Sequence, residues 1–551
     1  MQAVVPGWLR RYRREWLGAD TVAGLIIWSV VTPQCVAYAQ IAGLPPEAGL
    51  MAAPGAMLAY AWLGRSRSLV VSATTAASAL SAAAVGPIAH GDVASYAALS
   101  AALAIASAAV LAGAGLLRLG GVADLVSKPV MTGFMFGLGL TITADQLASV
   151  FGVKAGSGNF FPRLADLIGD LGSTHWPTFA VGAGSIVLLL GLKRLVPRVP
   201  GTLVVLVLAI LVSAVLHLPS HGVDVVGKLP TALPHPSFPH VSGRDFLDLL
   251  PAAFGIMLLS TEAVGVARTL ASQQHYSIDA NRELIALGGS NLLAGLSKGF
   301  VQSGGASQTA AADAAGGKSQ LASVIAAGLI LLTGAFLAPL FKDLPQATLA
   351  AIVIVAVSGF FRVDELRRFA RLRLSALIFA LVALVGVLAA GVLPGLLVAA
   401  ALSLMLVIYR LSRPSIGTLG RDPGTGAWGR QDRHPDWPGV PRILVARSDG
   451  PLFYANSLHV KERLLGLVEG ADPPPQAVVL ELAGSPDLDV ETLDALGELR
   501  DELASQGIEL RLASVRAPAL ALLETAGVTA GVSIASSLDA AVNGPGPLRT
   551  R

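Results

Sequence analysis

Long apolar runs, broken by short polar segments that contain proline or glycine, fill the chain from Asp20 to Arg410. A helix needs about 20 mostly apolar residues to cross a bilayer, and the runs and their breaks indicate consecutive spans. Fourteen spans are predicted, at 19–43, 46–64, 69–87, 95–117, 128–151, 176–194, 200–217, 246–270, 281–298, 304–315, 319–340, 343–361, 374–391 and 393–411. The pattern therefore predicts a polytopic α-helical membrane protein.

The predicted spans form two sets of seven on either side of a polar, proline-rich loop. Because seven is odd, the second set must enter the membrane in the opposite orientation, and such inverted repeats are typical of secondary transporters. The predicted parts are a cytoplasmic N-terminal arm (1–18), a first repeat (19–217), an extracytoplasmic connecting loop (218–245), a second repeat (246–411), a linker (412–440) and a C-terminal domain (441–551).

Lysine and arginine concentrate in the N-terminal arm and in alternate short loops, most densely between Arg362 and Arg373. Positive charge is retained on the cytoplasmic side of a membrane protein. We therefore expect a multi-pass protein of the cell inner membrane with both termini in the cytoplasm. Arg10 to Arg14 and the apolar residues after them also imitate a secretory signal, but the many apolar segments that follow argue against this interpretation.

Composition narrows the class of protein. Hydrophobic residues make up 53% of the chain and charged residues 14%, which is outside the range of soluble domains. The small net charge of +3 gives no nucleic-acid footprint, and the single cysteine, Cys35, excludes an internal disulfide and a cysteine metal site. We expect neither a cofactor nor a metal ion, and the spans hold no side-chain set typical of an enzyme.

The third segment of each set is short and rich in small residues: Leu69–Ser78 and Val301–Ala310. Each is predicted to begin as an extended stretch, at Leu69–Ser72 and Phe300–Ser303, and to continue as a half-helix that starts near the middle of the bilayer. The free N–H groups and positive dipole ends of two such helices would form a seat for an anion. Small residues of this kind also serve close helix packing, which is the alternative. The candidate substrate-binding residues are Ala73, Thr74, Ser307 and Gln308.

Two other spans carry polar candidates. Glu262 is the acidic residue well inside the eighth span, where a carboxylate costs about 2.5–3.5 kcal/mol. It is a candidate group for coupling transport to a proton or another cation such as sodium; a structural carboxylate bonded to Ser260 or Thr261 is the alternative. In the first span Gln34 and Tyr38 lie four residues apart and share a helix face. They are candidate ligands, although interhelical hydrogen bonding would also explain them.

Two groups of residues resemble a known family. They are Thr32-Pro-Gln-Cys-Val-Ala-Tyr-Ala-Gln-Ile-Ala-Gly-Leu-Pro-Pro-Glu-Ala-Gly-Leu50 in the first span, and Tyr276–Leu284, Gly289, Asn291 and Gly316–Leu321 further along. They resemble the sulfate permease family of anion transporters, called SulP in bacteria and solute carrier family twenty-six in animals. The resemblance implies a seven-plus-seven inverted repeat with core and gate domains, elevator-like alternating access and usually a homodimer.

The resemblance also implies an anion site between the third and tenth spans. Gln34, Tyr38 and Ser307 match positions that line the family's site, and Glu262 matches an acidic position of many bacterial members. Where many members have an arginine, this chain has Gln308. Because an amide supplies no charge, we expect proton symport of a carboxylate or dicarboxylate rather than sulfate or bicarbonate. An anion channel, an exchanger or a regulatory membrane scaffold remains the alternative.

The C-terminal part alternates predicted strands (442–447, 477–483, 508–513) with amphipathic helices (456–468, 490–506, 517–527), which indicates a small α/β layer domain. It resembles the STAS domain that ends most members of the family, through which cytoplasmic regulators would act. In related domains the loop at Pro486–Leu496 presents a phosphorylated Ser or Thr. Here Glu491 aligns with that position and predicts a fixed negative charge, whereas a one-residue slip would place Thr492 there.

Overall fold

The computed structural model describes residues 6–10, 12–121, 127–154, 156, 158–196, 199–229, 233–234 and 236–544. Parts of the predicted arm (1–5 and 11), connecting loop (230–232 and 235) and C-terminal domain (545–551) therefore lie outside the described residues. The chain divides into two compact units, a first unit at Met1–Ser403 and a second unit at Leu404–Arg551. α18 (Val392–Ser412) runs across this division.

The first unit is helical, and each of the fourteen predicted spans overlaps a helix. The elements that precede the second predicted set of spans are α1 (Gly7–Arg10), η1 (Arg14–Trp16), α2 (Leu17–Ile41), α3 (Pro46–Leu63), β1 (Val71–Ser72), α4 (Thr75–Ala89), α5 (Val93–Leu116), α6 (Lys128–Phe151), α7 (Phe160–Asp170), η3 (Leu171–Ser173), α8 (Trp176–Leu195), α9 (Gly201–Val215) and η4 (Leu218–His221). Then follow α10 (Gly243–Asp248), α11 (Leu250–Gln273), α12 (Ala280–Leu296), β2 (Ser303–Gly304), α13 (Ala306–Ala314), α14 (Leu321–Leu332), η5 (Thr333–Leu337), η6 (Ala338–Asp343), α15 (Gln346–Val357), η7 (Ser358–Phe360), α16 (Val363–Leu372), α17 (Leu374–Ala390) and α18.

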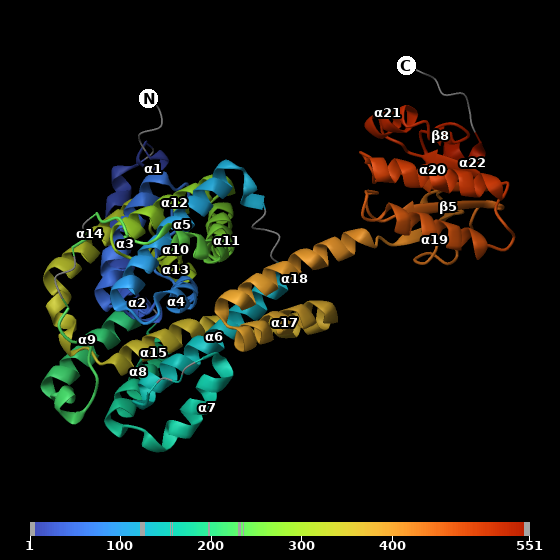
Figure 1. The fold of residues 1–551 in the computed structure, drawn as a ribbon. Helices are drawn as coiled ribbons and strands as arrows, with labels where there is room; N and C mark the ends of the chain where they lie inside the picture. Colours follow the sequence, from blue (N-terminus) through green and yellow to red (C-terminus); the bar gives the residue numbers. More distant parts are fainter. Residues whose placement is uncertain are drawn as a thin grey trace. The chain divides into compact units, whose positions relative to one another are not determined.

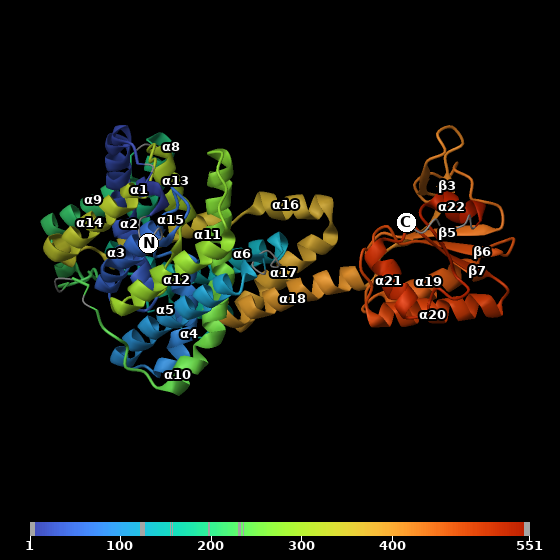
Figure 2. The same ribbon diagram turned by 90° about the horizontal axis from the view of Figure 1, so that it is seen from above.

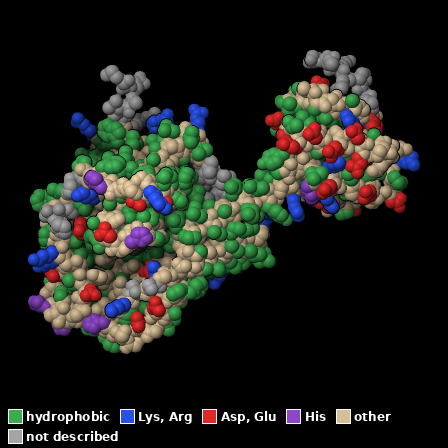
Figure 3. All heavy atoms as spheres, in the orientation of Figure 1, with side chains coloured by type: hydrophobic (Ala, Val, Ile, Leu, Met, Phe, Trp, Pro, Cys, Tyr) green, Lys and Arg blue, Asp and Glu red, His purple; other side chains and the backbone are tan. Residues whose placement is uncertain are grey.

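These helices form a membrane-type unit. By length and composition, eight helical stretches of the described chain could cross a membrane, and α4, α9 and α17 are shorter apolar helices. Large apolar side chains such as Val187, Leu211 and Val385 lie exposed on the outer helices, and Figure 3 shows hydrophobic side chains over much of the visible face of this unit. Such a surface suits a lipid environment, where hydrogen bonds within the helices satisfy the backbone.

The helices of the first unit pack as two bundles. The first bundle consists of α2–α5 and α11–α14, in which α12 packs against α3 and α5 while α14 packs against α2 and α3. In the second bundle α6 packs against α15 and α17, and α8 packs against α9 and α15. Figure 1 shows these two groups, which overlap in the view of Figure 2. They correspond to the core and gate that the family resemblance implied.

Glycine allows α2 and α3 to approach closely at the motif that carries the family resemblance. A Cβ on Gly49 would lie 2.0 Å from the carbonyl oxygen of Cys35 and 2.6 Å from its carbonyl carbon. Both atoms belong to the backbone of α2, so the neighbouring helix cannot yield by a side-chain rotation. Small residues at such crossings bring helix backbones together.

Gly49→Ala should therefore destabilise the protein by about 1–3 kcal/mol, because α3 must move away from α2. Thermal unfolding of the detergent-purified chain measures the effect. Gly184→Ala on α8 is the matched control, since a Cβ there would meet nothing within 4 Å and alanine favours a helix. A melting temperature of Gly49→Ala equal to that of Gly184→Ala would contradict this packing.

The second unit is a six-stranded sheet with helices on both faces. Its elements are β3 (Ile416–Arg421), β4 (Trp428–Arg430), β5 (Ile443–Ser448), α19 (Ser457–Glu469), β6 (Ala477–Glu481), α20 (Val490–Ser505), β7 (Glu509–Ala513), α21 (Ala517–Thr525), β8 (Ser533–Ala535) and α22 (Leu538–Asn543). The strand order is β4-β3-β5-β6-β7-β8, with β5 to β8 parallel and β3 antiparallel to both its neighbours. One apolar core lies beneath α19, α20 and α21 and a smaller one beneath α22. The three predicted strands and three predicted helices are confirmed.

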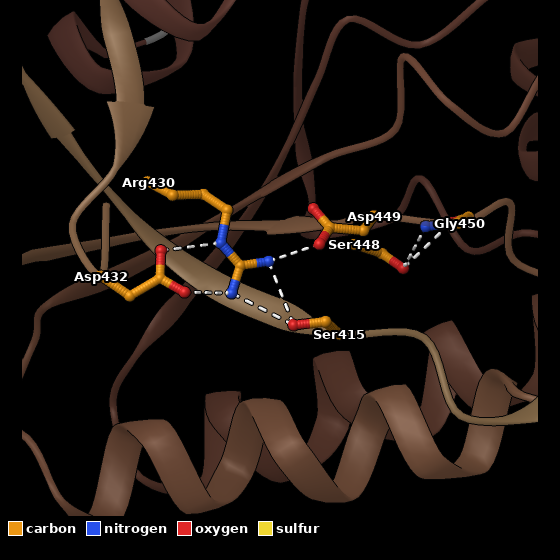
Figure 4. A network of polar contacts seen from close by, with 6 residues as sticks. All are labelled: Ser415, Arg430, Asp432, Ser448, Asp449 and Gly450. Carbon is orange, nitrogen blue, oxygen red and sulfur yellow. Dashed lines mark hydrogen bonds and ion pairs between the residues drawn. The ribbon is translucent and has the colours of Figure 1, made fainter. Parts of the chain in front are cut away.

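The segment 412–440, predicted as a linker, differs in the structure because it holds β3 and β4. Arg430 at the end of β4 fixes this pair to the sheet, as Figure 4 shows. Its guanidinium donates to Asp432 at 2.7 and 3.0 Å and to Asp449 at 2.6 Å, and these bonds raise the pKa of Arg430. β4 has only three residues, and the two buried apolar side chains of β3, Ile416 and Leu419, stand among Gly417, Thr418, Gly420 and Arg421, so the apolar pattern from which strands are predicted is weak here.

Thr492 takes part in the hydrogen bonds at the N-terminal end of α20. Asp489 caps α20 by accepting from the Thr492 N–H at 2.9 Å and the Thr492 hydroxyl at 2.5 Å, and it also accepts from the Tyr454 N–H at 2.6 Å. Burial opposes ionisation of Asp489, but these hydrogen bonds prevail and lower its pKa. Thr492 is fully buried whereas Glu491 is exposed. In this conformation the Thr492 hydroxyl is part of a helix cap and is not presented at the surface.

Candidate functional site

Two extended segments cross at the centre of the first bundle, and a helix starts just after each. β1 and β2 pair antiparallel, with Val71 opposite Gly304 and Ser72 opposite Ser303. α4 begins at Thr75 and α13 at Ala306, and neither helix has a side-chain cap. The predicted order of an extended stretch followed by a short helix is confirmed in both segments. Because the first N–H groups of a helix have no partner within it, both helices direct unpaired donors toward this crossing.

Buried amides from neighbouring helices hold the extended segments in place. Asn291 on α12 makes a pair of hydrogen bonds with the backbone of Gln302, each of 2.9 Å. Gln320, before α14, donates to the carbonyls of Ser66 and Leu69 at 3.0 and 2.8 Å. An extended backbone inside a membrane bundle needs such partners, because an unpaired polar group there is costly. Asn291 and Gln320 belong to the residues that resemble the known family.

Gln308 joins both half-helix segments to α2. Its side-chain nitrogen donates to Gln34 Oε1 at 2.7 Å and to the Ala73 carbonyl at 3.1 Å, and its oxygen accepts from the Ser72 hydroxyl at 2.8 Å. A Cβ on Gly305 would lie 2.1 Å from Gln308 Oε1, so glycine leaves room for this arrangement. Both N–H groups of the amide are used within the protein. Gln308 therefore positions Gln34 and the crossing segments.

A cavity of about 390 Å³ opens beside the starts of α4 and α13. Its wall on the first bundle includes Gln34 and Tyr38 from α2, Thr74 to Ala77 around the start of α4, Glu262 from α11 and Gly305 to Gln308 around the start of α13. Its wall on the second bundle includes Lys193, Thr202, Ile352, Val355 and Phe360. A larger cavity of about 850 Å³ shares Glu262, Ala306, Phe360 and Arg362 with it. The smaller cavity thus lies between the two bundles, beside a wider one.

Charged side chains frame the smaller cavity. Glu262 and Arg362 line both cavities and interact electrostatically, while Lys193 lines the smaller and Lys128 the larger. Neither Arg362 nor Lys193 has a predicted binding role. Arg362 belongs to the dense basic cluster from which the membrane topology is predicted. Both cations come from the second bundle, so only the fold brings them opposite the half-helices.

The structure brings most of the predicted site residues together. Gln34, Tyr38, Thr74, Ser307, Gln308 and Glu262 all line the smaller cavity. Ala73 is fully buried and contributes its carbonyl to the Gln308 hydrogen bonds. Gln34 and Tyr38 share one face of α2, as their spacing predicted. Their roles in binding stay predictions.

Family models identify both units of the chain. The model described as the sulfate permease family matches residues 17–405, which is most of the chain. The chain belongs to the sulfate permease family. The STAS domain model matches residues 434–541, so this member of the sulfate permease family ends in a STAS domain. The family is one of membrane transporters, in agreement with the helical first unit.

Relatives in the sulfate permease family extend over nearly the full chain. The chain is 37% identical over 508 residues to a probable sulfate transporter of Mycobacterium tuberculosis, with 92% of this chain and 91% of the relative covered. It is 29% identical over 550 residues to sulfate transporter 1.1 of Arabidopsis thaliana, with 93% of this chain and 83% of the relative covered.

Solved structures share the fold. The structure of SLC26A9 matches with a TM-score of 0.88 at 23% identity and covers 98% of this chain and 91% of its own. The transmembrane domain of the cyanobacterium bicarbonate transporter BicA matches with a TM-score of 0.63 at 21% identity and covers 71% of this chain and 98% of its own. At these identities the likeness concerns the fold alone.

Proposed function

We propose that the protein is a secondary active transporter that binds a small anion in the cavity beside α4 and α13 and carries it across the cell inner membrane. Both termini would lie in the cytoplasm, where the STAS domain would meet regulators. A homodimer is the proposed assembly. The positions of the termini follow from the charge distribution along the sequence, and the homodimer follows from the resemblance to the family.

The single observation that carries this proposal is the position of the cavity between the bundles. The half-helix starts belong to the first bundle, whereas Lys193, Ile352 and Val355 on the opposite wall belong to the second. An anion held by the N–H groups of α4 and α13 would move with the first bundle. An elevator-like displacement of this bundle against the second would then expose the anion alternately to the two sides of the membrane.

The cations around the cavity bear on which anion is carried. A carboxylate or dicarboxylate was favoured over sulfate or bicarbonate because Gln308 supplies no charge. Arg362 and Lys193 line the same cavity and supply positive charge from the second bundle, so this reason for disfavouring a doubly charged anion no longer holds. Relatives named as sulfate transporters add support for sulfate. We therefore propose an oxyanion substrate, with sulfate tested first and C4-dicarboxylates beside it.

We propose proton symport with Glu262 as the coupling group. Glu262 lies at the junction of the two cavities, opposite Arg362. When ionised, it repels an incoming anion and competes for Arg362; when protonated, it leaves this charge to the substrate. An inward proton gradient should therefore favour loading of the cavity.

Glu262→Gln should abolish the stimulation of uptake by an inward proton gradient, because the amide mimics the protonated carboxyl. Uptake of labelled sulfate and C4-dicarboxylates by proteoliposomes, with and without the gradient, measures this effect. Glu15→Gln is the control, since Glu15 is exposed before α2 and outside both cavities. Uptake by Glu262→Gln that stays fully dependent on the gradient would show that another group couples transport.

A further inference from the structure

A second concave site lies at one end of the first bundle. This pocket has a volume of about 650 Å³ and is formed where chain segments begin or end: the segment before α2, the loop after α3, the loop between α11 and α12, and the turn before α14. It shares no lining residue with the cavity at the starts of α4 and α13. We name it the end pocket.

Positive charge dominates the end pocket. Its lining includes five cationic side chains, Arg10, Arg65, Arg67, Arg282 and Lys318, against the single carboxylate of Asp279. Asp279 lies 4.0 Å from Arg282, at the limit of an ion pair. Within the part of the chain that the structure describes, no carboxylate oxygen lies within 4.0 Å of a side-chain nitrogen of Arg65, Arg67 or Lys318.

Two buried carboxylates beneath the end pocket bond mainly to its loop backbones. Asp20 accepts from the N–H groups of Lys318 and Ser319 at 2.7 and 3.1 Å and from the Ser319 hydroxyl at 2.6 Å. Glu283 accepts from the N–H groups of Arg65 and Ser66 at 2.9 and 3.2 Å and from the Tyr60 hydroxyl. These bonds fix the loops that carry Arg65 and Lys318. The side chains of Arg65 and Lys318 are exposed.

Aromatic side chains complete the wall. The Arg67 guanidinium lies over the Tyr276 ring, 4.8 Å from its centroid, and the Tyr276 hydroxyl accepts from the Arg67 N–H at 3.0 Å. A stacked guanidinium is held in place while its edge can still donate to an oxyanion. Trp8 and Trp16 line another part of the pocket, and the Trp8 indole donates to the Ala61 carbonyl at 2.7 Å. Tryptophan is enriched where a membrane protein meets lipid headgroups.

We propose that the end pocket binds a phosphate-bearing anion of at least two negative charges. Arginine matches the geometry of phosphate oxygens, and clusters of basic residues at membrane-facing ends of helices bind anionic headgroups. Two sources share this chemistry: the headgroup of an anionic phospholipid such as cardiolipin, and a soluble polyphosphate. The positive-inside rule accounts for the sign of these residues. The rule does not explain why these residues surround the end pocket, or why the buried carboxylates of Asp20 and Glu283 bond to backbone N–H groups and not to the Arg65 and Lys318 side chains.

Thermal unfolding of the purified full-length chain in neutral detergent tests this proposal, because a ligand that binds only the folded state raises the melting temperature. Cardiolipin and inorganic pyrophosphate are titrated separately. The test variant is Arg65→Gln/Lys318→Gln, since both side chains are exposed and neither takes part in the Tyr276 contact. Arg371→Gln/Arg373→Gln removes two exposed arginines outside the pocket and is the matched control. Lys318→Gln alone replaces the double variant if that variant unfolds.

Cardiolipin, pyrophosphate or both should stabilise the wild type and the control, and the test variant should need at least about tenfold more ligand for half of the effect. Stabilisation by cardiolipin alone identifies a lipid site. Stabilisation by pyrophosphate that competes with cardiolipin identifies a site open to soluble phosphates. No stabilisation by either ligand, or equal titrations of the test variant and the control, would overturn the proposal.

Discussion

Anion uptake by Gln308→Glu should fall at least about fivefold, because an unmatched buried polar group costs about 1–3 kcal/mol. The wild-type amide donates to Gln34 Oε1 and the Ala73 carbonyl. A carboxylate at this position has no N–H group to donate to Gln34 Oε1 or to the Ala73 carbonyl. It would also place negative charge beside the helix starts that are proposed to hold the anion, so binding should weaken further.

Initial rates of labelled anion uptake in proteoliposomes measure this effect, after the elution profile in detergent has shown that the variant is folded. Gln346→Glu is the matched control: Gln346 is exposed in the first turn of α15, where a carboxylate is favourable, and lies outside the cavity. Transport by a folded Gln308→Glu at the rate of this control would show that the Gln308 hydrogen bonds do not shape the binding site.

Arg362→Gln should raise the half-saturating anion concentration by roughly fivefold to thirtyfold, since one charge at a partly screened cavity wall contributes about 1–2 kcal/mol. The loss should be larger for a doubly charged anion than for a singly charged one, and it should shrink at high ionic strength. This dependence on anion charge and ionic strength distinguishes the loss of a positive charge from a change in the shape of the cavity.

Concentration dependence of sulfate and chloride uptake at low and high salt measures the effect of Arg362→Gln. Arg367→Gln is the control, because Arg367 is exposed on the neighbouring helix α16 but lines neither cavity. Equal half-saturation for the two variants would assign the selection of anions to the helix starts alone. Lys193→Gln should have the same direction of effect, since Lys193 also lines the smaller cavity.

The sequence predicts much of this protein because its membrane helices depend on local composition. Apolar length located helices of the first unit, and the small residues of Leu69–Ser78 and Val301–Ala310 indicated extended segments followed by short helices, which β1, α4, β2 and α13 confirm. The spacing of Gln34 and Tyr38 indicated a shared face. These features follow from helical periodicity and from the hydrogen-bonding needs of a backbone in lipid.

Contacts between distant segments could not be predicted in the same way. Lys193 and Arg362 reach the cavity only because the second bundle folds against the first, and a basic residue near a span end is already explained by topology. The hydrogen bonds of Gln308 to Gln34 and Ser72 likewise join residues far apart in the chain. The strands β3 and β4 escaped prediction because β4 has three residues and the buried Ile416 and Leu419 of β3 are separated by polar residues and glycine, so neither strand shows an apolar run.

Selenate, a scattering analogue of sulfate, provides the most direct test of where the anion binds. A structure of the full-length chain with saturating selenate should show an anomalous peak within hydrogen-bonding distance of the first N–H groups of α4 and α13, in the cavity that Gln34 and Tyr38 line. A peak found only elsewhere, or no peak in a protein that takes up sulfate saturably, would contradict the proposed site.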